Sequence, residues 1–433
     1  MIYHAVVDRF PVPVPLDPPS AAIFVAAIVA AAALTARRPA YGLAALVVST
    51  PVAFAHETFG TTITLPKAVL AGVLIGLTTY GGVVKSLRTR PAPLLLAALA
   101  LYFAATALTI FDAAHRGATI REALKVVQYA VVFIAAFLCY RFDDDDAPVV
   151  AAVAIAAIGV SLTALAQEAI GAPSGLYLGA AIVPRIAGLL EGPNQLSGYC
   201  EIAVAALGAW ALVRRSALIG AALGLAVFAD VLTFSRAGLA ALALVAALLL
   251  LAGGAGAWRA LRPGFAGLAA GVAGAIWWAI YAHNPGVLRA SLEPSIYAGG
   301  VGNRSELWHA AWRMWLAHPM LGVGAGNFEA MLPLYGVLGV RTHANSWYLQ
   351  SLAEGGIVLF GATVVLVGAA LAGFVARGAL ARWRSSPWIV AAFAASAALA
   401  VHQTVDYLVF YPKVGDAWWL LLGIGAAAVA RGV

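Results

Sequence analysis

Long apolar stretches recur along almost the whole chain, and most are close to the length that crosses a bilayer. A helix needs about 20 predominantly apolar residues to span the hydrocarbon core. The sequence predicts thirteen candidate spans, at 20–36, 40–56, 66–83, 92–112, 122–140, 147–169, 194–213, 216–234, 237–253, 264–283, 346–375, 387–410 and 416–431. These stretches are uniformly apolar and do not alternate, which argues against membrane strands. We therefore expect an all-α, polytopic helical bundle of 12 or 13 spans.

The composition excludes several other classes of protein. Hydrophobic residues make up 63% of the chain and charged residues 10%, whereas soluble domains have about 45–50% and about 25%. A soluble enzyme, a fibrous protein and a disordered chain do not fit these values. The net charge of +7 is expected to hold loops on the cytoplasmic side, so it does not indicate nucleic acid. Cys139 and Cys200 show neither metal-ligand spacing nor a disulfide framework.

Basic residues in the short connections orient the predicted spans. With thirteen spans, one set of them falls on a single side, which the positive-inside rule makes cytoplasmic; this set is Arg37, Arg38, Lys85, Arg88, Arg90, Arg141, Arg214, Arg215, Arg259, Arg262, Arg377, Arg382, Arg384 and Arg431. The acidic run Asp143–Asp146 lies on the same side and is expected to be a solvated loop. The opposite side holds the long connection 284–345. We therefore divide the chain into an N-terminal bundle (1–283), a loop domain (284–345) and C-terminal helices (346–433).

Several arginines lie on the side where topology does not require them. They are Arg185, Arg236, Arg289, Arg304, Arg313 and Arg341. Arg236 stands between two apolar runs, where a charge is costly unless it faces a polar cavity or a partner. Arginine suits phosphate because its planar fork donates two parallel hydrogen bonds. A polyprenyl diphosphate and a phospholipid head group are the two candidate anions. Snorkelling to the interface is the alternative, and it is favoured for Arg289, Arg313 and Arg341.

The stretch 303–318, NRSELWHAAWRMWLAH, predicts an amphipathic helix at the membrane interface. Asn303 and Glu306 have the spacing of a capping box, which starts a helix. Trp308, Trp312 and Trp315 then share one face and are interpreted as interfacial anchors rather than a sugar platform. Arg304 falls in the first turn, where free N–H groups already favour an anion.

Two further stretches follow in the loop. GVGAGN, within 318–331, is interpreted as a tight turn that needs glycine, because the strand and the full spacing of a nucleotide motif are missing. His343 precedes the span 346–375, whose cap is Asn345 or Ser346. A histidine at the mouth of a bundle is a candidate general base or only a loop ligand. Glu354 inside an apolar span needs a partner, for which Arg236 and Arg304 are candidates.

The remaining motifs bear on other functions. His402 and Asp406, four residues apart in a late predicted span, suit either a proton relay or a polar packing pair. A transporter would use them. The sequence contains no HExxH motif and no acidic pair placed to carry a metal and a nucleotide sugar. We therefore expect neither a metal nor a cofactor.

Several of these stretches together resemble a known family. GNRSELWHAAWRMWLAHPMLGVGAGNFEAM and HANSWYLQSLAEGG look like the signature of the O-antigen ligase / O-antigen polymerase superfamily. LTFSRAG and RIAGLLEGPNQLSGY are similar to other recurring segments of these proteins. The resemblance covers roughly residues 180–375, whereas the first 150 residues match only as a run of spans.

The resemblance implies a GT-C-like glycosyltransferase of the bacterial inner membrane, with its site facing the periplasm. Such enzymes move a glycan from undecaprenyl diphosphate without a metal, a nucleotide or another cofactor. The residues that the family holds essential match His343, Arg304 and Arg236 on this chain, as candidate base and diphosphate ligands. Further candidates for substrate binding are Arg185, Asn194, Asn345, Gln350, Glu354 and Arg341. Implied partners are the lipid-linked glycan donor, a lipid A–core acceptor and membrane lipids.

The acceptor separates the members of the superfamily. Ligases use a sugar of lipid A–core, polymerases use another repeat unit, and a third branch glycosylates protein. The chain ends soon after its last predicted span, without the soluble domain that longer protein-glycosylating relatives tend to carry. We therefore expect a ligase first, a polymerase second and a protein O-oligosaccharyltransferase third. A lipid or polysaccharide transporter is the alternative from a different class.

Overall fold

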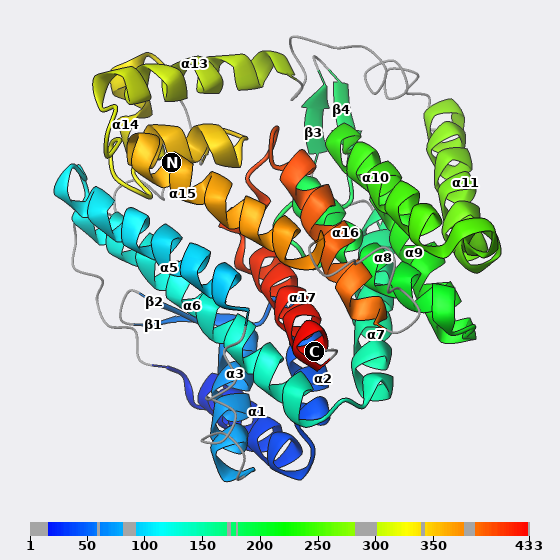
Figure 1. Ribbon diagram of the computed structural model, residues 1–433. Coiled ribbons are helices and arrows are strands. Elements are labelled where there is room, and N and C mark those ends of the chain that lie inside the picture. Colours follow the sequence, from blue (N-terminus) through cyan, green and yellow to red (C-terminus); the bar gives the residue numbers. More distant parts are fainter. Residues whose placement is uncertain are drawn as a thin grey trace.

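Helices make up nearly all of the described chain. The computed structural model describes residues 16–58, 61–80, 92–170, 175–178, 181–281, 301–338, 343–375 and 386–431. The first helices are α1 (Pro18–Arg37), α2 (Pro39–Ser49), α3 (Leu65–Thr79), α5 (Pro93–Leu108), α6 (Arg116–Phe142), α7 (Asp146–Ile170) and α8 (Pro193–Val213). They are followed by α9 (Ala217–Leu232), α10 (Arg236–Gly253), α11 (Ala257–Tyr281), α13 (Val301–Ala317), α14 (Phe328–Met331), α15 (Trp347–Val375), α16 (Pro387–His402) and α17 (Pro412–Arg431) (Figure 1).

All thirteen predicted spans contain a helix, so the all-α prediction is confirmed. Within the described residues, eight stretches are long and apolar enough to cross a membrane, and one of them, Arg236–Trp277, runs over both α10 and α11. Four shorter apolar helices, α2, α3, α9 and α16, have 10–17 residues. Many of these helices begin at a proline, which fits the first turn because the missing N–H would have no partner there. The count of 12 or 13 spans stays a prediction.

Two predicted spans are too long at their C-terminal ends. The predicted helix 40–56 ends at Ser49, shortly before Pro51, because proline has no N–H with which to continue the helical hydrogen bonds. The predicted helix 387–410 ends at His402, and a loop with the short 3-10 helix η4 (Leu408–Phe410) follows. Asp406 therefore lies in a loop and not in a membrane helix.

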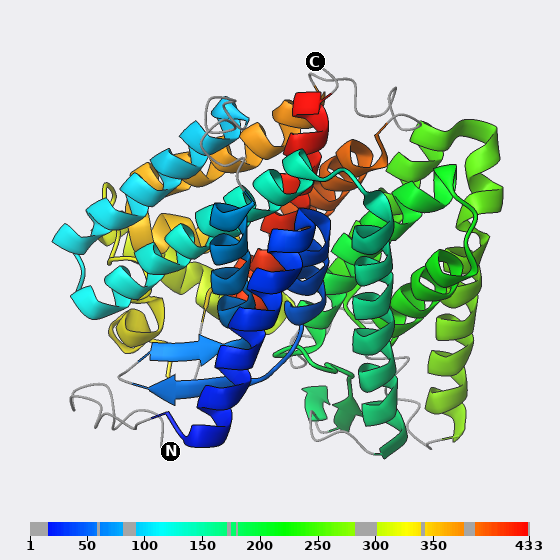
Figure 2. The same ribbon diagram turned by 90° about the horizontal axis from the view of Figure 1, so that it is seen from below.

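The described chain also contains two small β-hairpins, which the sequence did not predict. Strands β1 (Ala55–Thr58) and β2 (Thr61–Thr64) pair antiparallel, with Ala55 opposite Thr64. Strands β3 (Gly175–Leu178) and β4 (Ala181–Pro184) pair in the same way. Both hairpins lie at the end of the bundle that is opposite the C-terminus (Figure 2).

The acidic run Asp143–Asp146 is only in part the solvated loop that was predicted: the Asp144 side chain is 79% exposed, but all four carboxylates have protein partners. Arg38 pairs with Asp143 at 2.9 Å and with Asp145 at 3.1 Å, and Arg431 pairs with Asp144 at 2.8 Å. Asp146 accepts a hydrogen bond from Trp388 Nε1 at 2.8 Å. These contacts join the ends of α1, α6, α16 and α17. Residues that the charge pattern assigned to one side therefore meet at one end of the bundle.

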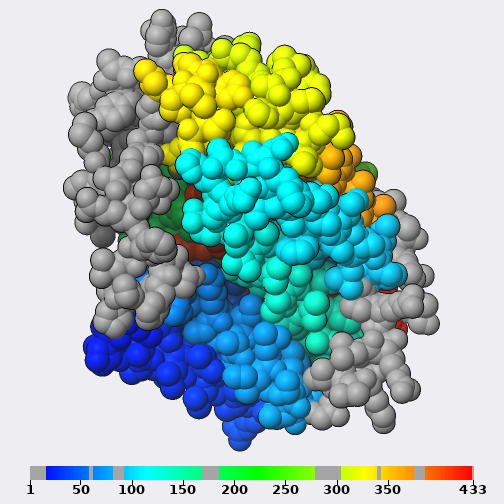
Figure 3. All heavy atoms as spheres, turned by 90° about the vertical axis from the view of Figure 1, so that its left-hand side faces the viewer, coloured from blue at the N-terminus to red at the C-terminus, as the bar shows by residue number. Residues whose placement is uncertain are grey.

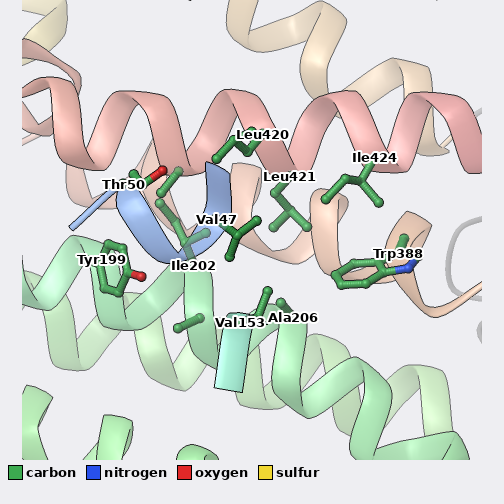
Figure 4. A pocket seen from close by; sticks show the side chains of 12 residues that line it. Val47, Thr50, Val153, Tyr199, Ile202, Ala206, Trp388, Leu420, Leu421 and Ile424 are labelled. Atoms are coloured by element: carbon green, nitrogen blue, oxygen red, sulfur yellow. The ribbon is translucent and has the colours of Figure 1, made fainter. Parts of the chain in front are cut away.

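Apolar side chains fill the centre of the bundle. Fully buried large residues include Phe133, Phe137, Trp388 and Trp419. A cavity of about 40 Å³ lies between α2, α7, α8, α16 and α17, and it is lined mainly by aliphatic and aromatic side chains (Figure 4). One face of the molecule is hollowed between the cyan helices and the blue N-terminal segment, with dark red atoms of the C-terminal part at the base (Figure 3).

The two ends of the bundle provide a test of topology. Glu57 on β1 and Arg215 after α8 are both exposed, whereas the native Cys139 and Cys200 are buried. In intact cells, a membrane-impermeant maleimide should label Glu57→Cys, and it should label Arg215→Cys only after the membrane is opened. Labelling of both cysteines from the same side would contradict the arrangement.

Candidate functional site

Three of the predicted arginines come together although they lie far apart in the sequence. Arg185 follows β4, Arg236 is the first residue of α10, and Arg304 lies in the first turn of α13. Arg304 and Arg236 are close enough to Arg185 for their positive charges to lower its pKa, and Arg236 acts on Arg304 in the same way. The three guanidinium groups therefore lie within electrostatic reach of one another.

The carboxylate of Asp406 joins this cluster. Its Oδ2 atom lies 3.7 Å from Arg304 and accepts a hydrogen bond of 2.6 Å from Asn194 Nδ2. The same Asn194 accepts a hydrogen bond of 2.7 Å from Arg185 through Oδ1. Arg185 also donates to the carbonyl oxygen of Thr233, which holds its side chain against the end of α9. Asp406 thus links arginines from two separate segments.

Burial sets the electrostatics of the cluster. Burial, and then the charges of the neighbouring arginines, lowers the pKa of Arg185 to about 10, while Asp406 opposes the shift. Burial also lowers the pKa of Arg304, and Asp406 again opposes it. With a pKa of about 10, Arg185 remains charged at neutral pH. Three cations held near one carboxylate leave a surplus of positive charge, which suits a diphosphate.

His343 lies beside the cluster and is only 6% exposed. Its ring is surrounded by three aromatic rings, Tyr407, Phe410 and Tyr411, at centroid distances of 6.0, 5.7 and 5.9 Å. Burial, the largest cause, lowers the pKa of His343; the charge of Arg304 lowers it further and that of Asp406 raises it. The ring is therefore neutral over a wide range of pH.

The hydrogen bonds of His343 fix its tautomer. Nδ1 accepts from the backbone N–H of Asn345 at 3.1 Å, and Nε2 lies 3.1 Å from the Tyr411 hydroxyl. Because a neutral imidazole carries one N–H, the proton lies on Nε2 and is donated to Tyr411. The basic lone pair is then on Nδ1.

Two other predicted residues hold the His343 loop in place. The Gln350 side chain accepts a hydrogen bond of 2.7 Å from the Ala344 N–H. Ser346 caps α15 by accepting from Leu349 N–H at 3.3 Å, as predicted for this position. Asn345 has a left-handed backbone with φ of 50°, which turns the chain so that its N–H meets the imidazole.

Glu354 does not pair with Arg236 or Arg304, and this corrects the expected pairing. Its Oε1 accepts a hydrogen bond of 3.0 Å from Phe328 N–H, at the start of α14. The glycine-rich turn is thereby tied to α15. Gly322, Gly324 and Gly326 have φ of +64°, +94° and +75°, which confirms that this turn needs glycine.

A break in α15 explains why the glycine-rich turn packs against this helix. Gly356 has φ of 57° and interrupts the helix. The Ala353 and Glu354 carbonyl oxygens accept from Val323 and Gly324 N–H at 3.0 and 2.9 Å, and Ile357 N–H donates to Pro319 O at 2.9 Å. The turn therefore satisfies the polar backbone groups that the break exposes.

Helix α13 is amphipathic, as predicted, but it begins at Val301, so Asn303 is inside the helix and does not cap it. Its buried face consists of Leu307, Ala310, Ala311 and Met314. Trp312 is 48% exposed, which is compatible with an interfacial anchor. Arg313 instead donates to the Tyr335 carbonyl oxygen. Arg289 and Arg341 lie outside the described residues.

The sequence did not predict the roles of Asp406, Tyr411 and Glu201. His402 was paired with Asp406 on spacing alone, but its Nδ1 lies 2.6 Å from Glu201 Oε1 of α8, with both side chains buried. The sequence does contain a signal for the role of Glu201. Asn194, Ser197 and Glu201 recur on one face of α8, and a polar face in an apolar span indicates polar partners. Among the described residues no group of three or more His, Cys, Asp or Glu side chains is arranged to hold a metal.

The helices and the eight apolar stretches within the described residues define an all-α polytopic membrane protein, and its described segments bring an arginine cluster beside a buried histidine. Residues 202–364 match the family described as O-antigen ligase, and this confirms the resemblance to the O-antigen ligase / O-antigen polymerase superfamily. No curated protein matches the chain. The family supports a ligase- or polymerase-type glycosyl transfer, with lipid-linked glycan and lipid acceptor substrates in general.

Substitution of Glu354 tests whether this residue stabilises the fold or binds the substrate. Glu354→Ala removes the acceptor of the buried Phe328 N–H and should lower the free energy of unfolding by about 1–3 kcal/mol. Glu354→Gln keeps a carbonyl oxygen and should be milder. Thermal unfolding of the purified protein in detergent measures both. A loss of donor binding by the alanine variant at unchanged thermal stability would instead place Glu354 in the substrate site.

Proposed function

We propose that this protein transfers O-antigen glycan from undecaprenyl diphosphate to a sugar hydroxyl of lipid A–core, at the periplasmic face of the inner membrane. The observation that carries the proposal is the convergence of Arg185, Arg236 and Arg304 beside Asp406 and His343. The description of the matching family as O-antigen ligase supports lipid A–core as the acceptor.

The arginines act on the donor. Their guanidinium groups bind the diphosphate oxygens and stabilise the negative charge that grows as the bond between the anomeric carbon and the diphosphate oxygen breaks. Arg236 is exposed and receives the incoming lipid-linked diphosphate. Arg304 and Arg185 are held through Asp406 and Asn194, so their positions are set before the donor arrives. The diphosphate is a good leaving group, so the step uses no metal.

His343 acts on the acceptor. Its Nδ1 lone pair takes the proton of the acceptor hydroxyl as the new bond to the anomeric carbon forms. The acceptor hydroxyl replaces the Asn345 N–H as the hydrogen-bond donor to Nδ1. Nε2–H continues to donate to Tyr411 and keeps the ring oriented. The proton passes from Nδ1 to the departing diphosphate. A single displacement of this kind inverts the anomeric carbon.

Purified protein with a defined lipid-linked donor tests the reaction. Transfer to lipid A–core should proceed in EDTA, and His343→Ala should lower kcat by roughly 10²–10⁴-fold because general base catalysis contributes about that factor. Arg304→Ala should weaken donor binding as well as turnover. Wild-type thermal stability in both variants is the control for folding.

The same assay distinguishes the alternatives. Extension of the donor glycan without transfer to lipid A–core would indicate a polymerase, and transfer to a protein would indicate a protein O-oligosaccharyltransferase. A requirement for an added divalent metal, or unaltered turnover by His343→Ala, would contradict the mechanism. Glycosyl transfer without an ion gradient separates an enzyme from a transporter.

The pH dependence follows from the lowered pKa of His343. The base is active when the ring is neutral, and burial moves the pKa below its usual value of 6.5. Activity should therefore be retained as the pH falls through 6.5 and should be lost only at lower pH. The acidic side of the profile of kcat against pH measures this loss of activity. A midpoint at or above 6.5 would mean that His343 is not the titrating base.

A further inference from the structure

An apolar crevice of about 350 Å³ lies between α8, α9, α10 and α11. All its lining residues are apolar, and the α10 side is formed by a row that includes Leu239, Ala243 and Ala247. Gly264 and Leu268 contribute from α11. Ala243, Ala247 and Leu268 are exposed, so the crevice opens at the surface of the bundle. A volume of 350 Å³ is within the range of ligand pockets, about 300–1,000 Å³.

Close packing elsewhere keeps this space open. Gly267 of α11 lies against the backbone of Gly224 of α9, where an added Cβ would lie 2.1 Å from the Gly224 carbonyl oxygen. This contact holds α11 on α9, and α11 has few contacts with α10 although the two helices are consecutive (Figure 1). Alanine and glycine along the walls leave the gap between them unfilled.

One end of the crevice lies one helical turn from Arg236 of the arginine cluster. Arg236 is the first residue of α10, and Leu239, the first lining residue of that helix, is one turn further. The lining row then continues through Ala243 and Ala247 to Leu250, which spans about 16 Å along a helix. A ligand with its anionic end at Arg236 would therefore find an apolar channel that begins directly below it.

We propose that this crevice binds the polyprenyl chain of the lipid-linked donor; the proposal rests on the function proposed above. The occupant is identified by two features together, an arginine one helical turn from one end of the crevice and a long wall without polar groups. The small residues of the wall leave room for the methyl branches of a polyprenyl chain, which an unbranched acyl chain lacks. The crevice sets the depth of the donor, so that its diphosphate stops at the arginines.

Packing contacts are expected to supply most of the free energy with which the polyprenyl chain binds in the crevice. A chain that enters the crevice leaves lipid rather than water, so little hydrophobic free energy is gained and close contact between surfaces is the main attraction. Filling the crevice should therefore weaken donor binding by a measurable factor and not abolish it. The effect should depend on the length of the chain, since a short chain does not reach below the first turn of α10.

Phenylalanine substitutions provide the test. Ala243→Phe and Ala247→Phe fill the crevice from exposed positions, whereas Ala270→Phe is exposed on the other side of α11 and is the matched control. For a donor with the natural chain length, KM should rise roughly tenfold in the two crevice variants, because many atom contacts are lost. For a donor with the same glycan on a chain of two isoprene units, KM should equal that of the wild type. The control should match the wild type with both donors.

Unchanged KM in the crevice variants, or an equal rise for the short and long donors, would overturn the proposal.

Photolabelling keeps the test independent of turnover. A diazirine at the far end of a polyprenyl diphosphate should label α10 and α11 in the wild type, and it should label them less in Ala247→Phe. Labelling of these helices by a diazirine phospholipid that polyprenyl diphosphate does not displace would assign the crevice to a membrane lipid and would also overturn it. Absence of transfer by the wild type, with correct photolabelling, would contradict only the proposed reaction.

Discussion

The carboxylate of Asp406 holds the candidate site together. Cations repel one another, and a buried charge is costly unless it is paired. Asp406 is almost fully buried, and through Oδ2 it contacts Arg304 and Asn194, while Asn194 accepts from Arg185. One acidic group thus makes it possible to hold two arginines from distant segments close together. The charge it supplies offsets only part of theirs, so the cluster retains an attraction for an anion.

Irregular backbone places the catalytic candidates at the end of the bundle. His343 is in the loop before α15, Arg185 follows a hairpin, and Asp406 lies between α16 and α17. Each loop is fixed by contacts with a neighbouring helix, such as the hydrogen bond from Ala344 to Gln350. Trp347 N–H also donates to the carbonyl oxygen of Asp406 at 2.9 Å. Positions set in this way need little reorganisation when the substrates bind.

A second polar layer lies below the arginines, within the helices. Glu201 and His402 are paired at 2.6 Å and are almost completely buried. Asp230 of α9 is also fully buried. The Glu201–His402 pair joins α8 to the end of α16 and so anchors the start of the loop that carries Asp406. This layer therefore ties α8 to the helix that precedes the loop of Asp406.

The sequence by itself determined the class of fold and placed one set of basic residues and the acidic run Asp143–Asp146 at the same end of the bundle, and it supplied the candidate site residues. Apolar length requires helices, because every backbone group in a membrane must find a partner within its own segment. It also singled out Arg185, Arg236 and Arg304, since arginines on the non-cytoplasmic side are not required by topology, and His343, since it precedes the span 346–375. Only the tertiary structure assigned Asp406 to Arg304, Glu354 to Phe328 and His402 to Glu201. Such contacts join residues that are distant in the chain, and a polar face on a helix predicts that a polar partner exists but not which residue it is. The tertiary structure also decided where α16 ends and where α10 and α11 diverge, since those features depend on how the helices pack and not on the hydropathy of any one of them.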